Sequence, residues 1–494
     1  MTIVEHFAAS TSAFEALVGF FAGPDAASLT HAELEMRLKA DGFEVLRCVL
    51  QDHLDLRAAR EERLEGVVGA DGVSRGYAEG GHQRPLATIF GQVRVDRVAY
   101  RRKKATNLHP ADAALNLPED LHSHGLREMA AVECARGSFE EAKAAIDRAG
   151  ATSVAKRQVE NLARAAAVDF EAYYDQAERP AAAEGEVMVI SADGKGIVMR
   201  PEGLRAPTAA AAARSRTKLK GRLSKGEKAN RKRMAEVGAV YTVTPVPRTP
   251  ADVMARGDGR SKDAPKAGHK WLTASVADDA ASVIARVFDE AGRRDPGGDH
   301  EWVALVDGNR HQIDRIHAEA AARGIHITVL VDWIHVLEYL WSAAWSFFAE
   351  GDPTAEDWVG AKALDLLAGK ASIVAAAIRR KATALGLSDS ERKNADACAD
   401  YLLAKSPYLD YPTALAKGWP IGTGVIEGAC RHLVKDRMDI TGARWGLDGA
   451  EAVLKLRALQ ANGAWNDYWS FHLRQERTRV HGSRYLDGVI PAAA

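Results

Sequence analysis

The sequence predicts an α/β protein with a mixed sheet flanked by helices, and three short apolar runs carry that prediction. They are Val187 to Val198 (VMVISADGKGIV), Trp302 to Gly308 (WVALVDG) and Ile325 to His335 (IHITVLVDWIH). Each run is bounded by turn residues, which is typical of a buried strand. Each places one aspartate, Asp193, Asp307 or Asp332, at a strand end, where an open α/β sheet presents its chemistry. Because neighbouring carboxylates repel one another, the pattern indicates a divalent metal between them.

Composition sets the broad class. A chain of 494 residues suggests about three domains, and the net charge of -1 means that any nucleic-acid signal must be local. The four cysteines (Cys48, Cys134, Cys398 and Cys430) have no metal-site spacing, so we expect reduced thiols. The N-terminus lacks a basic leader, and no run approaches the ~18 apolar residues of a membrane span. We therefore expect a soluble, cytoplasmic protein.

The first part of the chain is predicted to be mostly helical. Residues 1–80 show apolar positions at helical spacing, and residues 81–183 combine a hairpin about Gly91 with further helices. A helix from Ser138, a break at Gly150 and a second helix capped by Ser153 have the outline of a DNA-binding helix-turn-helix. Any helical hairpin shares this outline. The basic residues of the second helix that would contact DNA are Lys156, Arg157 and Arg164.

A catalytic core is predicted from residue 184. Its first part, residues 184–337, reads as the Asp193 strand, a second strand, a basic loop and a third strand at Val237 to Val246. A helix from Ala277 to Arg293 follows, then the Asp307 strand, a helix through Ala322 and the Asp332 strand. Three strands, helix, strand, helix, strand, with acids on the first and fourth strands, is the layout of a ribonuclease-H-like fold.

The basic loop, residues 214–233, has few apolar residues to bury, so we expect a mobile arm that contacts a polyanion, or else a solvated loop. Its candidate DNA-binding residues are Arg214, Arg216, Lys218, Lys220, Arg231, Lys232 and Arg233.

A helical insertion, residues 338–420, then interrupts the core. The second part of the core, residues 421–475, places Glu427 near the start of a helix, where it completes a three-carboxylate set with the aspartates. Residues 476–494 are expected to be a C-terminal tail.

The motifs VISADGKGI, VALVDGNRH, VLVDWIHVLEYLW and GTGVIEGACRHLVKDRMDITGARW resemble those of bacterial insertion-sequence transposases of the DDE type, in particular the ISKra-like group. The resemblance covers roughly residues 80 to 470. It implies a transposase that cleaves and joins DNA ends, with Asp193 as the first acid and Glu427 as the last. The middle acid is Asp307 or Asp332; strand order favours Asp307, whereas Asp332 opens a DxxH element that ends at His335.

The expected chemistry uses two Mg²⁺ ions, for which Mn²⁺ can substitute, to stabilise the attacking and leaving oxygens of a phosphodiester. We expect Asp193 to bridge both ions and Asp307 and Glu427 to hold one each, with Asp332 as a further candidate ligand. His335 would orient a phosphate, donate to a leaving oxygen or position Asp332; a buried structural histidine is the alternative.

Residues near the glutamate are candidates for holding the DNA strand. The tryptophan would stack on an unpaired base, or else pack in the core. These candidates are Arg431, Lys435, Arg437, Arg444 and Trp445. The expected partners are double-stranded DNA, as transposon ends and target, and a second copy of the chain, because two ends must be handled together; no membrane is expected.

Three competing functions remain open from the sequence. A ribonuclease-H-like nuclease or resolvase would share the core, and a non-catalytic DNA-binding protein derived from a transposase would share the fold without the activity. A metal-dependent hydrolase of small molecules is disfavoured by the basic loop, for which a small substrate has no use.

Overall fold

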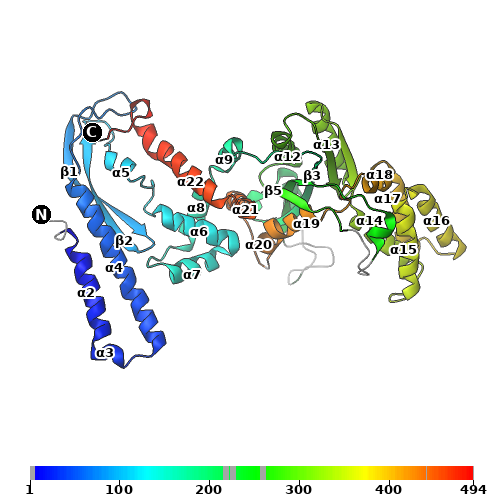
Figure 1. Ribbon diagram of the computed structural model, residues 1–494, viewed down its shortest axis with the longest axis horizontal. Coiled ribbons are helices and arrows are strands. Elements are labelled where there is room, and N and C mark those ends of the chain that lie inside the picture. The colour runs from blue at the N-terminus through cyan, green and yellow to red at the C-terminus, as the bar shows by residue number, and fades with distance from the viewer. Residues whose placement is uncertain (1–5, 215–221, 223–229, 256–262, 441, 493–494) are drawn as a thin grey trace. The chain divides into compact units, whose positions relative to one another are not determined.

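The computed structural model describes residues 6–214, 222, 230–255, 263–440 and 442–492 (Figure 1). The chain divides into two compact units. Unit 1 comprises residues 1–177 together with 463–494, and unit 2 comprises residues 178–462. Within the described residues, no helix is both long and apolar enough to cross a membrane.

Unit 1 begins with a helical hairpin. Helices α2 (Ala8–Ala22) and α3 (Pro24–Ala27) lead into the long α4 (His31–Ala59), which starts at a capping box between Thr30 and Glu33. The expected β-hairpin follows as β1 (Tyr77–Thr88) and β2 (Gly91–Arg101), paired antiparallel. Gly91, in the turn, has φ +123°, a conformation that L side chains rarely adopt.

The helices expected to read DNA are present in unit 1. After the short α5 (Pro110–Ala114) come α6 (His124–Arg136), α7 (Phe139–Ala149) and α8 (Lys156–Ala166), which pack against one another, and then α9 (Phe170–Gln176). Ser138 caps α7 as expected. Ser153, however, does not cap α8: that helix begins after Ala155 without a side-chain cap, and the Ser153 hydroxyl instead bonds Asp147.

The C-terminal segment belongs to unit 1, which differs from the expected core segment and tail. Helix α22 (Trp465–Glu476) continues into a π-helical segment, η4 (Arg477–His481). The Glu476 carboxylate accepts a 2.6 Å hydrogen bond from the buried Arg127 of α6. Asp169, before α9, accepts hydrogen bonds from His472 at 2.7 Å and Arg479 at 2.9 Å. Buried ion pairs between segments about 300 residues apart leave no short-range sequence pattern.

Unit 2 is built on a five-stranded mixed sheet, ordered β5-β4-β3-β6-β7. The first three strands, β3 (Val187–Met199), β4 (Arg231–Val243) and β5 (Ala267–Ser275), run antiparallel to one another. Strands β6 (Glu301–Val306) and β7 (Ile327–Val331) run parallel to β3. The order of three strands, helix, strand, helix and strand is the expected one, although the second and third strands are not the segments expected.

The strand boundaries differ from those expected in two places. Strand β3 does not end at Asp193 but continues to Met199, because Gly194 to Met199 pair with β4. The segment from Pro201 to Arg214 forms a short 3-10 turn and α10 (Ala206–Arg214) rather than a second strand. The second strand is therefore β4, and the third is β5 (AGHKWLTAS), which the sequence analysis missed.

Helices cover the sheet. Helix α12 (Ala280–Arg294) packs on β3, β4 and β5, and Gly238 of β4 allows the close approach, since a Cβ there would lie 2.5 Å from a methyl carbon of Val287. Helix α13 (Arg310–Arg323) connects β6 to β7. Short helix α11 (Pro250–Met254) precedes β5.

The insertion is helical, as expected, and forms one group beside the strands in Figure 1. It contains α14 (Trp333–Ala344), α15 (Pro353–Leu367), α16 (Ala371–Ala384), α17 (Lys393–Lys405) and α18 (Tyr411–Ala416). The chain then returns to the sheet through α19 (Gly424–Ala429), a π-helical segment η3 (Cys430–Lys435), α20 (Asp436–Met438) and α21 (Leu447–Ala461).

Candidate active site

Three aspartates occupy one row across the parallel part of the sheet. Ser191 of β3 pairs with Leu305 of β6, which in turn pairs with Leu330 of β7. Asp193, Asp307 and Asp332 each stand two residues beyond these partners. Adjacent strands lie about 4.8 Å apart, and residues in register on parallel strands share one face of a sheet. The pairing therefore gathers the three carboxylates at one edge of unit 2.

The carboxylate of Asp193 is partly buried and lies beside a thiol. Its Oδ1 accepts a 2.6 Å hydrogen bond from the backbone N–H of Gly194, and its Oδ2 lies 3.2 Å from the Cys430 Sγ. Burial, followed by the negative charge of Asp193, raises the pKa of the Cys430 thiol far above its usual range. The thiol therefore stays protonated and donates to the carboxylate.

Glu427 reaches the same region from α19. This helix packs on β3 and β4, and Glu427 stands three residues before Cys430, so the two residues share one side of the helix. The Glu427 side chain is exposed, and its Oε1 accepts a 3.1 Å hydrogen bond from the Thr423 hydroxyl. The helix widens into η3 at Cys430, and such π-helical turns are frequent at functional sites.

Asp332 is engaged by the protein backbone. Its side chain is buried, with 2% of the residue exposed. Its Oδ1 accepts a 2.9 Å hydrogen bond from the Thr423 N–H. Its Oδ2 accepts a 3.1 Å hydrogen bond from the His335 N–H, and through this bond the Asp332 side chain caps α14. Both oxygens thus have backbone donors.

Asp307 contacts the helical insertion. Its Oδ1 accepts a 2.7 Å hydrogen bond from the Asn309 N–H, and its backbone carbonyl accepts one of 3.1 Å from the Tyr401 hydroxyl of α17. Burial raises the pKa of Tyr401 above its usual range, so this hydroxyl remains a donor. The Tyr401 ring stacks on Tyr339 of α14 at 3.9 Å between centroids, and His335 lies edge-on to both rings.

His335 is partly exposed beside this aromatic pair, and its Nδ1 lies 3.3 Å from a carboxylate oxygen of Glu338. The histidine contacts Asp332 through its backbone N–H, not through the ring.

Three residues of this region were not predicted: Cys430, Thr423 and Tyr401. Cys430 had a signal, because it follows Glu427 at helical spacing. Thr423 and Tyr401 act through long-range contacts that no local pattern reveals. A further acid, Glu236, pairs with Gly194 in the β3–β4 register and so faces the other side of the sheet from Asp193. Burial raises the pKa of Glu236.

The carboxylates fit Mg²⁺ in their donor chemistry, since hard cations take oxygen ligands. As the side chains stand, no group of three or more His, Cys, Asp or Glu within the described residues is close enough to hold a metal ion. The exposed Glu427 side chain has the freedom to turn toward the aspartates, whereas Asp332 does not.

The basic residues of α8 lie on its exposed surface. Lys156 is 3.1 Å from Glu140 of α7, and Arg157 is 3.6 Å from Glu160; both basic side chains are more than half exposed. Arg164 is partly buried. Exposed pairs of this kind are weak, so Lys156 and Arg157 are available to a phosphate.

Most of the basic loop lies outside the described residues. Arg216, Lys218 and Lys220 are among the residues of the loop that are not described. Arg214 is exposed at the end of α10. Arg231, Lys232 and Arg233 are not in a loop but begin β4. Lys232 pairs with Asp439 at 2.9 Å. Arg233 donates to the carbonyls of Gly203 and Ala277, and burial lowers its pKa.

The residues after Glu427 divide into two groups. Arg431, Lys435 and Arg444 are exposed. Arg437 and Trp445 are buried, at 3% and 5% exposed, with the guanidinium 4.6 Å from the ring centroid.

Trp445 is held by three hydrogen bonds, two of which join it to the end of β3 and one to α20. Its indole N–H donates to the Met438 carbonyl at 3.0 Å. Its backbone N–H donates to Val198 at 3.0 Å, and its carbonyl accepts from Arg200 at 2.8 Å. These contacts give Trp445 the packing role rather than the base-stacking one.

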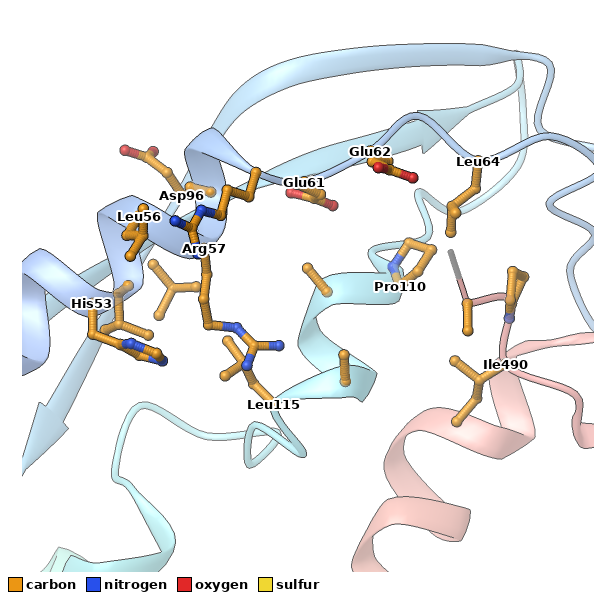
Figure 2. Close-up of a pocket in the computed structure, with 18 of the residues that line it drawn as sticks. His53, Leu56, Arg57, Glu61, Glu62, Leu64, Asp96, Pro110, Leu115 and Ile490 are labelled. Carbon is orange, nitrogen blue, oxygen red and sulfur yellow. The ribbon is translucent and has the colours of Figure 1, made fainter. Parts of the chain in front are cut away.

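A cavity of about 380 Å³ lies in unit 1 (Figure 2). Leu56, Leu115 and Ile490 give it an apolar lining, and Arg57 and Glu61 stand among the charged residues around it. None of the candidate site residues lines this cavity.

A scan against models of known protein families gives no match to the chain. A search of curated proteins gives no significant match either.

Proposed function

We propose that this chain is a DDE-type transposase that cleaves and joins the ends of an insertion sequence by metal-dependent hydrolysis and transesterification. The observation that supports the proposal is that Asp193 and Asp307 follow paired positions of adjacent strands, while α19, which carries Glu427, packs on the Asp193 strand. Asp193 and Asp307 share a register row. Glu427 stands on the helix whose Cys430 contacts Asp193.

The sheet topology supports a ribonuclease-H-like core. Three antiparallel strands followed by two strands parallel to the first, with the first strand at the centre, is the arrangement of that fold. In that fold the acids stand on the central strand, after the fourth strand and on a later helix. We assign Asp193, Asp307 and Glu427 to these three places.

Asp193, Asp307 and Glu427 are the residues that would hold two Mg²⁺ ions. When bound, such ions stabilise the attacking and leaving oxygens of the phosphodiester and offset the repulsion between the acids and DNA. Cys430 keeps one oxygen of Asp193 in place as a protonated donor. The exposed Arg431, Lys435 and Arg444 supply positive charge for phosphates next to the acids.

Unit 1 supplies the second element of a transposase, a surface for DNA. Helix α8 presents Lys156 and Arg157 to solvent, and unit 2 has a basic block of its own in the sequence around Arg214. In a chain of net charge -1, local positive charge of this kind gives salt-dependent affinity for DNA.

The test is cleavage and joining of duplexes taken from the DNA that flanks the chain's own gene, with Mg²⁺ or Mn²⁺. Loss of a group that holds a catalytic metal removes several kcal/mol of transition-state stabilisation, so Asp193→Asn, Asp307→Asn and Glu427→Gln should each lower the rate by roughly 10²–10³-fold.

Asp314→Asn is the matched control, because Asp314 is an exposed acid on α13, and it should leave the rate unchanged. Cleavage without joining of pre-cut ends would favour the nuclease alternative. Equal rates for the wild type and all three acid variants would refute the proposal.

A further inference from the structure

The loop that leads to Glu427, residues 420–424, is fastened to the end of β7. The backbone N–H of Trp333 donates to the Ile421 carbonyl at 2.8 Å. The backbone N–H of Thr423 donates to the Asp332 Oδ1 at 2.9 Å, and both residues of this bond are buried. These two hydrogen bonds join segments that the whole helical insertion separates in sequence.

Asp332 is itself held rigidly. Its backbone N–H donates to the Val306 carbonyl at the end of β6, and its Oδ2 caps α14 through the His335 N–H. The Asp332 carboxylate therefore ties the loop to β6, β7 and α14 at once.

The loop is also packed, since Pro420, Ile421 and Thr423 are buried. A cavity of about 450 Å³ lies beside it, lined by Trp333, Pro420, Ile421 and Gly422 among others. The hydrogen bonds to the β7 end act together with this packing to hold the loop.

Thr423 links the loop to Glu427. Its backbone bonds Asp332, and its hydroxyl donates to the Glu427 Oε1 at 3.1 Å, one helical turn further on. One threonine thus connects a buried carboxylate to an exposed one.

We propose that Asp332 is a positioning residue, which sets the place of Glu427 through Thr423 and does not itself hold a metal ion. A ligand for Mg²⁺ must stand where the ion can keep several waters. Asp332 is only 2% exposed and its two oxygens accept N–H groups of the loop and of α14, whereas Asp193 and Asp307 are partly exposed. The inference rests on the proposed function only in the role that it gives to Glu427.

The experiment compares four variants of the full chain: Asp332→Asn, Thr423→Val, Thr423→Ser and Asp307→Asn. Amide hydrogen exchange of residues 421–429 reports the restraint, Mn²⁺ binding by calorimetry reports the metal site, and strand joining reports activity. Asp332→Asn removes one of the two carboxylate oxygens that accept backbone N–H groups. Thr423→Val keeps the hydrogen bond from the backbone N–H of residue 423 to Asp332 and removes only the hydroxyl that donates to Glu427.

We expect Asp332→Asn to speed exchange at 421–429, to lower the joining rate by roughly 10–100-fold, as for residues that orient metal ligands, and to weaken Mn²⁺ binding less than Asp307→Asn does. Thr423→Val should lower the joining rate similarly, and Thr423→Ser should restore it. Asp307→Asn should weaken Mn²⁺ binding without changing exchange at 421–429.

Loss of Mn²⁺ affinity in Asp332→Asn equal to that in Asp307→Asn would overturn the proposal, as would unchanged exchange at 421–429. Thr423→Val supplies a separate test should Asp332→Asn fail to fold: a joining rate equal to wild type would overturn the relay to Glu427. The two proposals can fail separately. If the wild-type chain joins no DNA but the variants show the expected changes in hydrogen exchange and Mn²⁺ binding, the transposase assignment is refuted. The conclusion that Asp332 holds the loop in place would still be supported.

Discussion

Replacing Asp169 by Asn should release the C-terminal helix of unit 1. Burial alone would raise the pKa of the Asp169 carboxyl, but hydrogen bonds from His472 and Arg479 more than offset it and lower the pKa from 3.8 to about 2. That difference corresponds to about 2 kcal/mol of stability at neutral pH. The residue is 6% exposed, so solvent screens these bonds little.

Hydrogen exchange measured on peptides of α22 is the suitable assay, because a two-unit chain need not unfold in one step. A loss of about 2 kcal/mol corresponds to roughly 30-fold faster exchange there. Asp487→Asn is the matched control: this residue is exposed and has φ 53°, a conformation that Asn tolerates. Exchange in the control should equal that of the wild type.

The pH dependence gives a second measurement on the same variant. A carboxyl whose pKa is lowered by folding contributes stability fully above its ordinary pKa and loses it as the pH falls toward the folded value. The difference between wild type and Asp169→Asn should therefore be constant near neutral pH and shrink from about pH 4 toward pH 2. A difference that stays constant to pH 2, or α22 exchange unchanged by the substitution, would refute the reasoning.

Substitutions at four further residues test the site and the DNA surface. Cys430→Ala removes the donor to Asp193 and should slow strand joining roughly tenfold, and Cys430→Ser should recover most of the rate; equal rates for Ala and wild type would contradict the role of the thiol. Trp445→Ala should destabilise unit 2 by about 3–5 kcal/mol in urea unfolding, whereas a folded variant with reduced affinity for single-stranded DNA would restore the base-stacking role. Lys156→Ala and Arg157→Ala should each weaken binding to duplex DNA and lower its salt dependence by about one ion, and an unchanged salt slope would remove α8 from the DNA surface.

The acids could be predicted from sequence because each aspartate interrupts or follows an apolar run. Apolar runs of five or six residues indicate buried strands, and Asp193, Asp307 and Asp332 are the residues at which those runs stop. The continuation of β3 past Asp193 could not be predicted, since Gly194 and Gly196 are poor strand formers and only pairing with β4 keeps them extended. Strand β5 was missed for a related reason: its exposed half carries polar residues, His269 and Lys270, before the apolar Trp271 and Leu272.

The contacts that give the site its shape lay beyond sequence analysis. Thr423 bonds Asp332 across a separation of 91 residues, and Cys430 bonds Asp193 across 237. The burial of Trp445 follows from the same cause, because its backbone pairs with the end of β3 rather than with a neighbour in sequence. Local periodicity predicts which elements form, but it carries no information on which loops meet.

The division of the chain also determines when each part can be completed during synthesis. Helices α6 and α9 of unit 1 leave the ribosome well before α22, which supplies partners of Arg127 and Asp169. Unit 2 is synthesised between the two parts of unit 1. Glu427, the last of its candidate catalytic acids, is added only after the whole helical insertion has been made. The nascent chain must therefore keep the buried faces of α6 and α9 uncovered while nearly 300 further residues are added. A chain that stops before Glu427 would therefore lack both the C-terminal helix of unit 1 and the full set of candidate acids.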